Sequence, residues 1–246
     1  RGSERDPATG ILASADVLET TRTIRAAVAE RLAAGERLFL AGGCCAELPG
    51  ALAGARDALG FGFGLVHLDG HADLYDGASS TTGEAADMPV AVALGLGPAA
   101  WVEAADGASV SPRHTLLVGY RDREESIADG MRQPESLPEP PVLLPVEAVR
   151  ERGAAALGAE LAERLPLSGL FWLHFDVDVL DQAVFPATDY LLPGGLEWEE
   201  AHALLAPLLG SPALIGASLG CYNPDKDPDL ACGRALVEAL SAVARG

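Results

Sequence analysis

The chain has few basic and few aromatic residues. Lys and Arg number 17 against 36 Asp and Glu, so the formal net charge is −19, and aromatic residues make up 5% of the 246 residues. Nucleic-acid-binding domains cluster Lys and Arg on one surface, and no such cluster stands in this sequence. We therefore expect no nucleic-acid partner and favour a small cationic or neutral ligand.

Long hydrophobic runs and a cysteine framework are also missing. No apolar run reaches the roughly 18 residues of a membrane span, and the N-terminal stretch RGSERDPATG lacks the apolar centre of a secretory signal. Cys44 and Cys45 are adjacent, whereas Cys221 and Cys232 stand far along the chain, which matches neither a C-x-x-C zinc pattern nor a disulfide framework. We expect no membrane partner, a cytoplasmic location, and cysteines that are free thiols or ligands.

The chain does contain apolar strands that alternate with Ala/Leu-rich helices. Strands are expected at 37–43, 64–69, 115–120, 170–178 and 213–219, and helices at 17–35, 44–60, 147–165 and 198–209. This alternation is typical of right-handed crossovers and a mostly parallel sheet covered on both faces. The sequence predicts one α/β domain over residues 1–246, a three-layer α/β/α sandwich with long polar loops at 73–89 and 119–142.

Acidic residues follow two of the expected strands. Asp69, His71 and Asp73 alternate after one strand, and Asp176 and Asp178 alternate after another. Alternate residues of an extended segment project to the same side, and ligands of open parallel sheets bind beyond the carboxyl ends of the strands. Four carboxylates and one imidazole would therefore face one point, which requires cations between them. The oxygen-rich donors favour Mn²⁺ or Mg²⁺, as a pair about 3.5 to 4 Å apart.

Other interpretations of these residues remain open at this point. A D-x-H-x-D segment can be a strand-end cluster whose carboxylates bind loop amides. Asp-x-Asp after an apolar strand is also the first motif of haloacid-dehalogenase-like phosphohydrolases, although that reading leaves residues 69–73 unexplained. His67 and His174 lie within expected strands, where we expect hydrogen-bonded core histidines.

The motifs, in their order, resemble those of the ureohydrolase family of arginases and agmatinases. The chain has GGCC at 42–45, DGHAD at 69–73, HFDVDVLDQAVFPAT at 174–188 and CYNP at 221–224. The family carries G-G-D-H, D-A-H-x-D, S-x-D-x-D-x-x-D-P and E-x-N-P. The resemblance runs from about residue 37 to the C-terminus and implies an arginase-like fold with two bridged Mn²⁺ ions and a shortened N-terminal strand region.

The resemblance also implies roles for individual residues. The implied metal ligands are Cys45, Asp69, His71, Asp73, Asp176 and Asp178, with Asp69 and Asp176 bridging the two ions. A hydroxide between the ions would attack a guanidinium or amidine carbon, with Asp73 orienting it, because metal binding makes water a usable nucleophile near neutral pH. Asp181 is expected to support the metal loop without ligating.

Three positions depart from the family pattern in ways that bear on the substrate. Cys45 replaces a histidine ligand, as in the branch of Nω-hydroxy-L-arginine hydrolases, although a small buried apolar role also fits it. Ala86 replaces the histidine proton shuttle of arginases, and Cys221 replaces the Glu that meets the substrate guanidinium. These losses favour a less basic substrate than arginine.

The substrate's α-amino group would meet the segment VGYRDREE, in which Asp122 and Glu124 correspond to the family's acidic residues. The resemblance therefore implies a metal-dependent hydrolase of C–N bonds in a small linear amidine or guanidine, with Nω-hydroxy-L-arginine-like chemistry as the specific hypothesis. The alternative is a catalytically silent homologue that keeps the fold as a binding module. The oligomeric state stays open.

Overall fold

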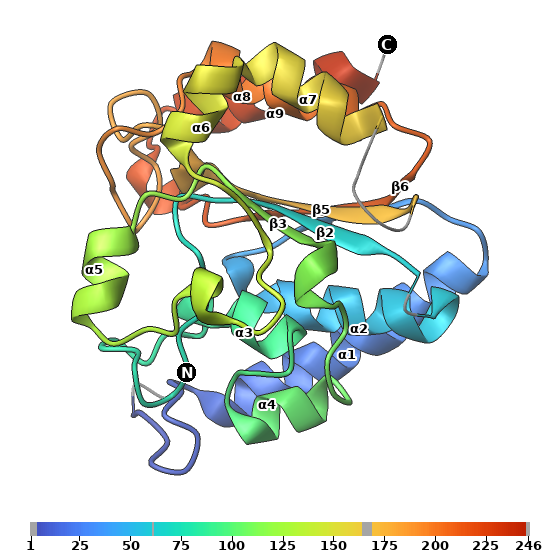
Figure 1. Cartoon of the computed structure of the whole chain (residues 1–246), viewed down its shortest axis with the longest axis vertical. Coiled ribbons are helices and arrows are strands. Elements are labelled where there is room, and N and C mark those ends of the chain that lie inside the picture. Colours follow the sequence, from blue (N-terminus) through green and yellow to red (C-terminus); the bar gives the residue numbers. More distant parts are fainter. Residues whose placement is uncertain (1–3, 61, 164–168, 245–246) are drawn as a thin grey trace.

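Six parallel strands form one sheet in the computed structural model, which describes residues 4–60, 62–163 and 169–244 (Figure 1). The spatial order is β1-β6-β5-β2-β3-β4, and every pairing is parallel. The strands are β1 (Leu38–Ala41), β2 (Gly64–Leu68), β3 (Thr115–Val118), β4 (Val142–Leu144), β5 (Phe171–Asp176) and β6 (Leu214–Gly220). The predicted mostly parallel α/β sandwich is confirmed.

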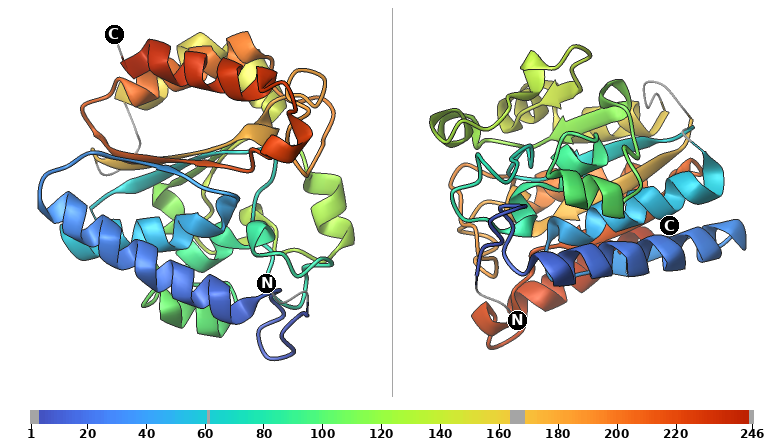
Figure 2. Two further views of the ribbon diagram at one scale, coloured as in Figure 1. Left: turned by 180° about the vertical axis from the view of Figure 1, so that it is seen from behind. Right: turned by 90° about the horizontal axis from the view of Figure 1, so that it is seen from below.

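Helices cover both faces of the sheet (Figures 1 and 2). One layer holds α1 (Ser14–Ala33), α2 (Leu48–Leu59), α3 (Pro89–Ala93) and α4 (Ala99–Ala104). The other holds α6 (Val146–Arg152), α7 (Ala154–Glu163), α8 (Trp198–Leu209) and α9 (Ala231–Ala244). The short helix α5 (Arg123–Ala128) stands to one side of the sheet in Figure 1. None of the described helices is both long enough and apolar enough to cross a membrane.

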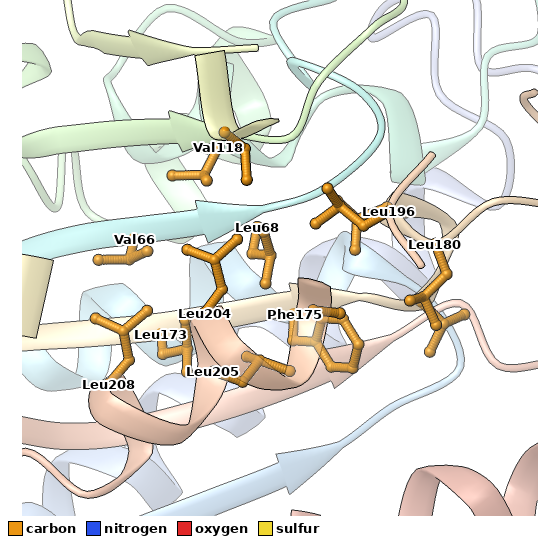
Figure 3. Packing of buried hydrophobic residues seen from close by; sticks show 14 of the residues in the cluster. Val66, Leu68, Val118, Leu173, Phe175, Leu180, Leu196, Leu204, Leu205 and Leu208 are labelled. Carbon is orange, nitrogen blue, oxygen red and sulfur yellow. The ribbon is translucent and has the colours of Figure 1, made fainter. Parts of the chain in front are cut away.

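The two-residue period of the central strands divides their side chains between two cores. Figure 3 shows Val66, Leu68 and Phe175 packed toward Leu204 and Leu208 of α8. The intervening strand residues belong to a second core, where Leu65 and Trp172 are buried with α1, α2 and α3. Continuing that second set along the chain leads to His67 on β2 and Asp69 directly after it, and to His174 and Asp176 on β5. The strand period thus brings these polar residues to one face.

Several elements differ from the sequence prediction. The edge strand β4 is three residues long and pairs only with β3 in the described sheet, too short to show a period. Helix α5 interrupts the expected loop at 119–142, and the expected helix at 147–165 is two helices broken at Gly153, which has a φ of 77°. Residues 164 and 165 of that expected helix lie outside the described residues. Helices α3, α4 and α9 were not predicted.

Candidate metal centre

A pocket lies at the carboxyl ends of β2 and β5, against the segment that follows β1. It brings together all six predicted ligands, and its lining includes Cys45, Asp69, His71, Asp73, Asp176 and Asp178. Each of them except His71 is buried. Cys45 begins a single 3-10 turn at Cys45–Glu47, which leads into α2. Residues far apart in the sequence therefore meet because three parallel strands end at one edge.

The Cys45 side of the pocket is closed to solvent. Sγ of Cys45 lies 2.6 Å from Oδ2 of Asp176, to which the thiol donates, and 3.7 Å from Oδ2 of Asp69. Nε2 of His174 lies 3.1 Å from the same sulfur. Cys221 adds a second thiol, with its Sγ 3.6 Å from that of Cys45. Two thiols, one imidazole and two carboxylates thus lie close together.

The His71 side of the pocket is more open. Nδ1 of His71 lies 3.1 Å from Oδ2 of Asp178 and 3.5 Å from Oδ1 of Asp69, and its side chain is 21% exposed. The amide of Gly70 donates to Oδ1 of Asp178 at 3.0 Å. A Cβ at residue 70 would lie 2.8 Å from that oxygen, so glycine is needed for this approach. The D-G-H segment therefore wraps closely around Asp178.

His67 is not the hydrogen-bonded core histidine that the sequence predicts. Its Nε2 lies 3.2 Å from Oδ2 of Asp69 and 3.5 Å from Oδ2 of Asp73. Among the described residues, neither ring nitrogen of His67 nor Oδ2 of Asp73 has a partner with hydrogen-bond geometry, although all three atoms are buried. An unpaired buried polar atom is costly, and a cation between the histidine and the carboxylate would satisfy both. The site therefore fits a metal.

His174 is hydrogen-bonded, as predicted, but it also faces the site. Its Nδ1 lies 2.8 Å from Oγ of Ser218, and its Nε2 faces Cys45. The rings of His174 and His67 stack with their centroids 5.2 Å apart, because the two residues are in register on neighbouring strands. The missed signal was their spacing, since both histidines precede a predicted ligand by two residues and so share its face.

Burial and neighbouring charges shift the pKa values of the clustered side chains. Burial, with the charge of Asp69, raises the pKa of Asp73 to about 8. Burial, with the charge of Asp178, raises the pKa of Asp176 well above its usual range. Burial lowers the pKa of His67 and neighbouring Asp69 raises it, and the net value is about 10. Burial lowers the pKa of His174 to about 3, so that ring is neutral. Bound metal ions would displace the extra protons.

Asp69 is common to three groups of potential ligands. Each group has donor atoms within 4.8 Å of one another. The groups are Cys45, Asp69, His174 and Asp176; His67, Asp69 and Asp73; and Asp69, His71 and Asp178. The bridging roles of Asp69 and Asp176 stay predictions; Asp69 belongs to all three groups and Asp176 to one, and the groups include two further histidines.

The predicted substrate residues are placed differently from one another. Asp122 is buried and lines the pocket, where it accepts from the amide of Ala72 at 3.3 Å, and Cys221 also lines it. Glu124 is exposed and stands outside the described lining, whereas Glu125 of the same helix is part of it. Sequence reasoning missed Glu125, because a one-residue shift along a helix turns a side chain by about 100°.

Two features of the surrounding loops hold the site in shape. Asp73 and Cys221 both adopt a left-handed backbone, with φ of 53° and 65°, which costs non-glycine residues energy and is commonly found at functional sites. Arg121 donates to the carbonyl oxygens of Asp178 at 2.8 Å and of Leu192 at 2.9 Å. Asp181 accepts from the amides of Gly194 at 2.6 Å and Gly195 at 3.1 Å. These bonds join residues 178–181, directly after β5, to residues 192–195 further along the chain.

Known proteins resemble this chain in sequence and in structure. An arginase of Brucella melitensis biotype 1 is 25% identical over 180 residues, which cover 73% of this chain and 57% of that protein. The N(omega)-hydroxy-L-arginine amidinohydrolase of Streptomyces lavendulae is 27% identical over 217 residues, covering 87% of this chain and 70% of that protein. The chain therefore spans little more than half the length of the first of these relatives.

The fold is that of an arginase. The solved structure of arginase from Bacillus caldovelox matches with a TM-score of 0.83 at 22% identity, over 98% of this chain and 79% of the other. A hypothetical agmatinase from Burkholderia thailandensis matches with a TM-score of 0.69 at 23% identity, over 92% of this chain and 64% of the other. The arginase family itself matches residues 8–244, and the chain therefore belongs to the arginase family.

Proposed function

We propose that this protein hydrolyses a C–N bond in a small linear guanidine or amidine. The observation that carries the proposal is the acidic pocket, where Asp69, Asp73, Asp176 and Asp178 meet. Other acidic residues, Asp87, Asp122, Glu125 and Asp129, line the same pocket, whose described lining includes no Lys or Arg. Such a pocket suits cations, namely metal ions at its base and a positively charged substrate above them.

The proposed cofactor is a pair of divalent ions, with Mn²⁺ at the position of His71 and Asp178, where the donors are oxygens and one imidazole. Asp69 is the carboxylate placed to reach both ions, and the unpaired atoms of His67 and Asp73 supply further donors. Such ions, when bound, lower the pKa of water enough to provide a nucleophile near neutral pH.

The protein's own residues would position the reactants. The carboxyl group of Asp73 is the proposed acceptor of a hydrogen bond from the attacking water, which would orient that water toward the substrate. Asp122 has a buried oxygen, Oδ1, without a hydrogen-bond partner among the described residues. That oxygen is the proposed contact for a substrate ammonium group, since a buried carboxylate binds strongly to an opposite charge.

The proposed substrate is a hydroxyguanidine related to Nω-hydroxy-L-arginine. Ala86 and Cys221 line the pocket at the positions where the resemblance places a histidine and a Glu. A thiol cannot form the paired, charge-assisted hydrogen bonds by which a carboxylate holds a guanidinium. The relative from Streptomyces lavendulae carries the name of an amidinohydrolase for that same substrate, which supports this choice.

A comparison of substrates tests the proposal. Protein loaded with Mn²⁺ would be incubated separately with L-arginine, agmatine and Nω-hydroxy-L-arginine. The primary amine that hydrolysis releases from each compound would be quantified by chromatography. We expect turnover of Nω-hydroxy-L-arginine at least about tenfold faster than that of L-arginine, and loss of turnover in Asp73→Asn. Faster hydrolysis of L-arginine would contradict the substrate class.

The second candidate function is binding without catalysis. The absence of the histidine at Ala86 favours it, because the resemblance implies a proton shuttle there. Under this alternative, Mn²⁺-loaded protein would bind one of the three compounds in calorimetry and release no product from it. The arginase family assignment argues against the haloacid-dehalogenase-like alternative, because it explains residues 69–73 and 174–188 together.

A further inference from the structure

His174 stands at a position for which the resemblance implies no metal role. The family motif S-x-D-x-D has serine where this chain has His174, two residues before Asp176. In the same site Cys45 replaces a histidine. The imidazole that is lost at residue 45 is thus matched by another imidazole from β5, whose Nε2 lies 3.1 Å from the Cys45 sulfur. The two residues that differ from the family motifs, Cys45 and His174, are therefore in contact with each other.

The distances among the four donors suit a small tetrahedral ion. A tetrahedral shell with metal–ligand bonds of about 2.0–2.3 Å places neighbouring donors about 3.3–3.8 Å apart. The Cys45 sulfur lies 3.7 Å from Asp69, within this range, and 3.1 Å from His174, just below it, and all four donors lie within 4.8 Å of one another. The 2.6 Å contact with Asp176 is a thiol hydrogen bond, and it would lengthen when a metal ion replaces the proton.

The side chain of His174 is also held in place by a neighbour. Oγ of Ser218 lies 2.8 Å from Nδ1 of His174, and the same oxygen accepts from Nε1 of Trp172 at 3.0 Å. Metal-binding histidines commonly use the second ring nitrogen in this way, which fixes the ring orientation. Ser218 and His174 are in register on β6 and β5, so the sheet itself sets this geometry.

We propose that Cys45 and His174, with Asp69 and Asp176, form a metal position that selects Zn²⁺ over Mn²⁺. Thiolate with imidazole is a donor pair typical of zinc, whereas Mn²⁺ prefers oxygen donors. The four protein donors fill a tetrahedral shell, which leaves the more open position beside His71 for substrate water. This inference rests on the proposed dinuclear site and changes the identity of one of its ions.

Competition between metals tests the selectivity. Metal-free protein kept reduced would be dialysed against equal concentrations of Zn²⁺ and Mn²⁺, desalted and measured by elemental mass spectrometry. We expect the wild type to retain one tightly held Zn²⁺ per chain. We expect Cys45→Ser and His174→Asn each to weaken that Zn²⁺ by at least about tenfold, and Cys45→His to raise the share of Mn²⁺.

Cobalt reports on the ligands directly. Co²⁺-loaded wild type should show thiolate-to-cobalt charge-transfer absorption in the near ultraviolet. Cys45→Ser should abolish that band, His174→Asn should keep it with altered visible bands, and Cys221→Ser should leave both unchanged. His202→Ala, at an exposed histidine of α8, is the matched control for His174. Should His174→Asn fail to fold by circular dichroism, the Cys45 variants still decide the question.

The outcomes separate this inference from the proposed function. Two Mn²⁺ per chain after competition, or a cobalt band that survives in Cys45→Ser, would overturn the zinc position. If product release from Nω-hydroxy-L-arginine persisted in that case, the proposed function would stand alone. If Zn²⁺ selectivity held but none of the three compounds were hydrolysed, the metal position would stand and the proposed function would fall.

Discussion

The two sides of the acidic cluster differ in chemistry and in access to solvent. On one side, Cys45 and His174 are 2% and 0% exposed and combine sulfur, nitrogen and oxygen donors. On the other side, His71 is 21% exposed and stands among carboxylates. A buried, mixed donor set suits an ion that stays in place, whereas an open oxygen-rich set leaves room for substrate. In the proposed dinuclear site, the buried half would hold an ion in place and the open half would act on the substrate.

Removing the residue common to both sides should have the largest effect. Asp69→Asn is expected to lose both ions and to lower turnover by at least about a hundredfold, beyond the effect of residues that only orient ligands. Elemental analysis after desalting measures the metal content, and a product-release assay measures turnover. Asp16→Asn, at an exposed carboxylate of α1, is the control. Near-normal metal content in Asp69→Asn would show that Asp69 is not a bridging ligand.

Removing a ligand from the open side should affect one metal position and leave the other occupied. His71→Asn is expected to lower the metal content from two ions to one and to stop turnover, while the cobalt–thiolate absorption at Cys45 persists. The physical reason is that His71 reaches only Asp69 and Asp178 among the grouped ligands. Loss of both ions in this variant would mean that the two positions fill cooperatively, which would contradict the division into a holding side and a reacting side.

The metal-free protein should lose stability as the pH rises from 7 to 9. The folded pKa of Asp73 is raised to about 8 and that of His67 to about 10, so the folded state binds more protons than the unfolded state in this range. His174 has its pKa lowered to about 3 and therefore contributes no opposite slope above pH 7. The thermal midpoint measured in chelator should fall across this range, and metal ions should restore it. A rising midpoint would contradict the assigned protons.

Weakening the loop around Asp178 should lower stability slightly and should affect metal binding on the open side only. Arg121→Lys replaces a planar guanidinium that donates to five carbonyl oxygens with one ammonium, and should lower the free energy of unfolding by about 1–2 kcal/mol. Chemical denaturation measures this change. Arg113→Lys, at an exposed ion pair with Glu139, should stay within about 0.5 kcal/mol. Weaker binding at the Cys45 side in Arg121→Lys would show that the two halves are coupled.

The sequence predicts which residues meet in the pocket, but the extended backbone expected through them is not present. Asp73 has a left-handed φ of 53°, and Asp178 lies in a 3-10 turn at Val177–Val179. Asp69, His71 and Asp73 alternate within five residues, and the structure brings them to one pocket with Asp176 and Asp178. Substrate residues were harder to predict, because helix α5 lies within an expected loop and places Glu125, not Glu124, in the described pocket lining. A period of 3.6 residues cannot be recognised in a helix of only six residues.

The sequence predicts five of the six strands, the acidic residues that follow two of them, and the family motifs, because each of these depends on residues that are neighbours in the chain. Only the tertiary structure decided that His174 meets Cys45, from which it is separated by 129 residues. It also places Nε2 of His67 between Asp69 and Asp73, where neither ring nitrogen has a partner with hydrogen-bond geometry among the described residues. These contacts follow from the sheet order, in which β5 lies between β2 and β6. Long crossovers set that order, and no local pattern in the chain encodes which strands become neighbours.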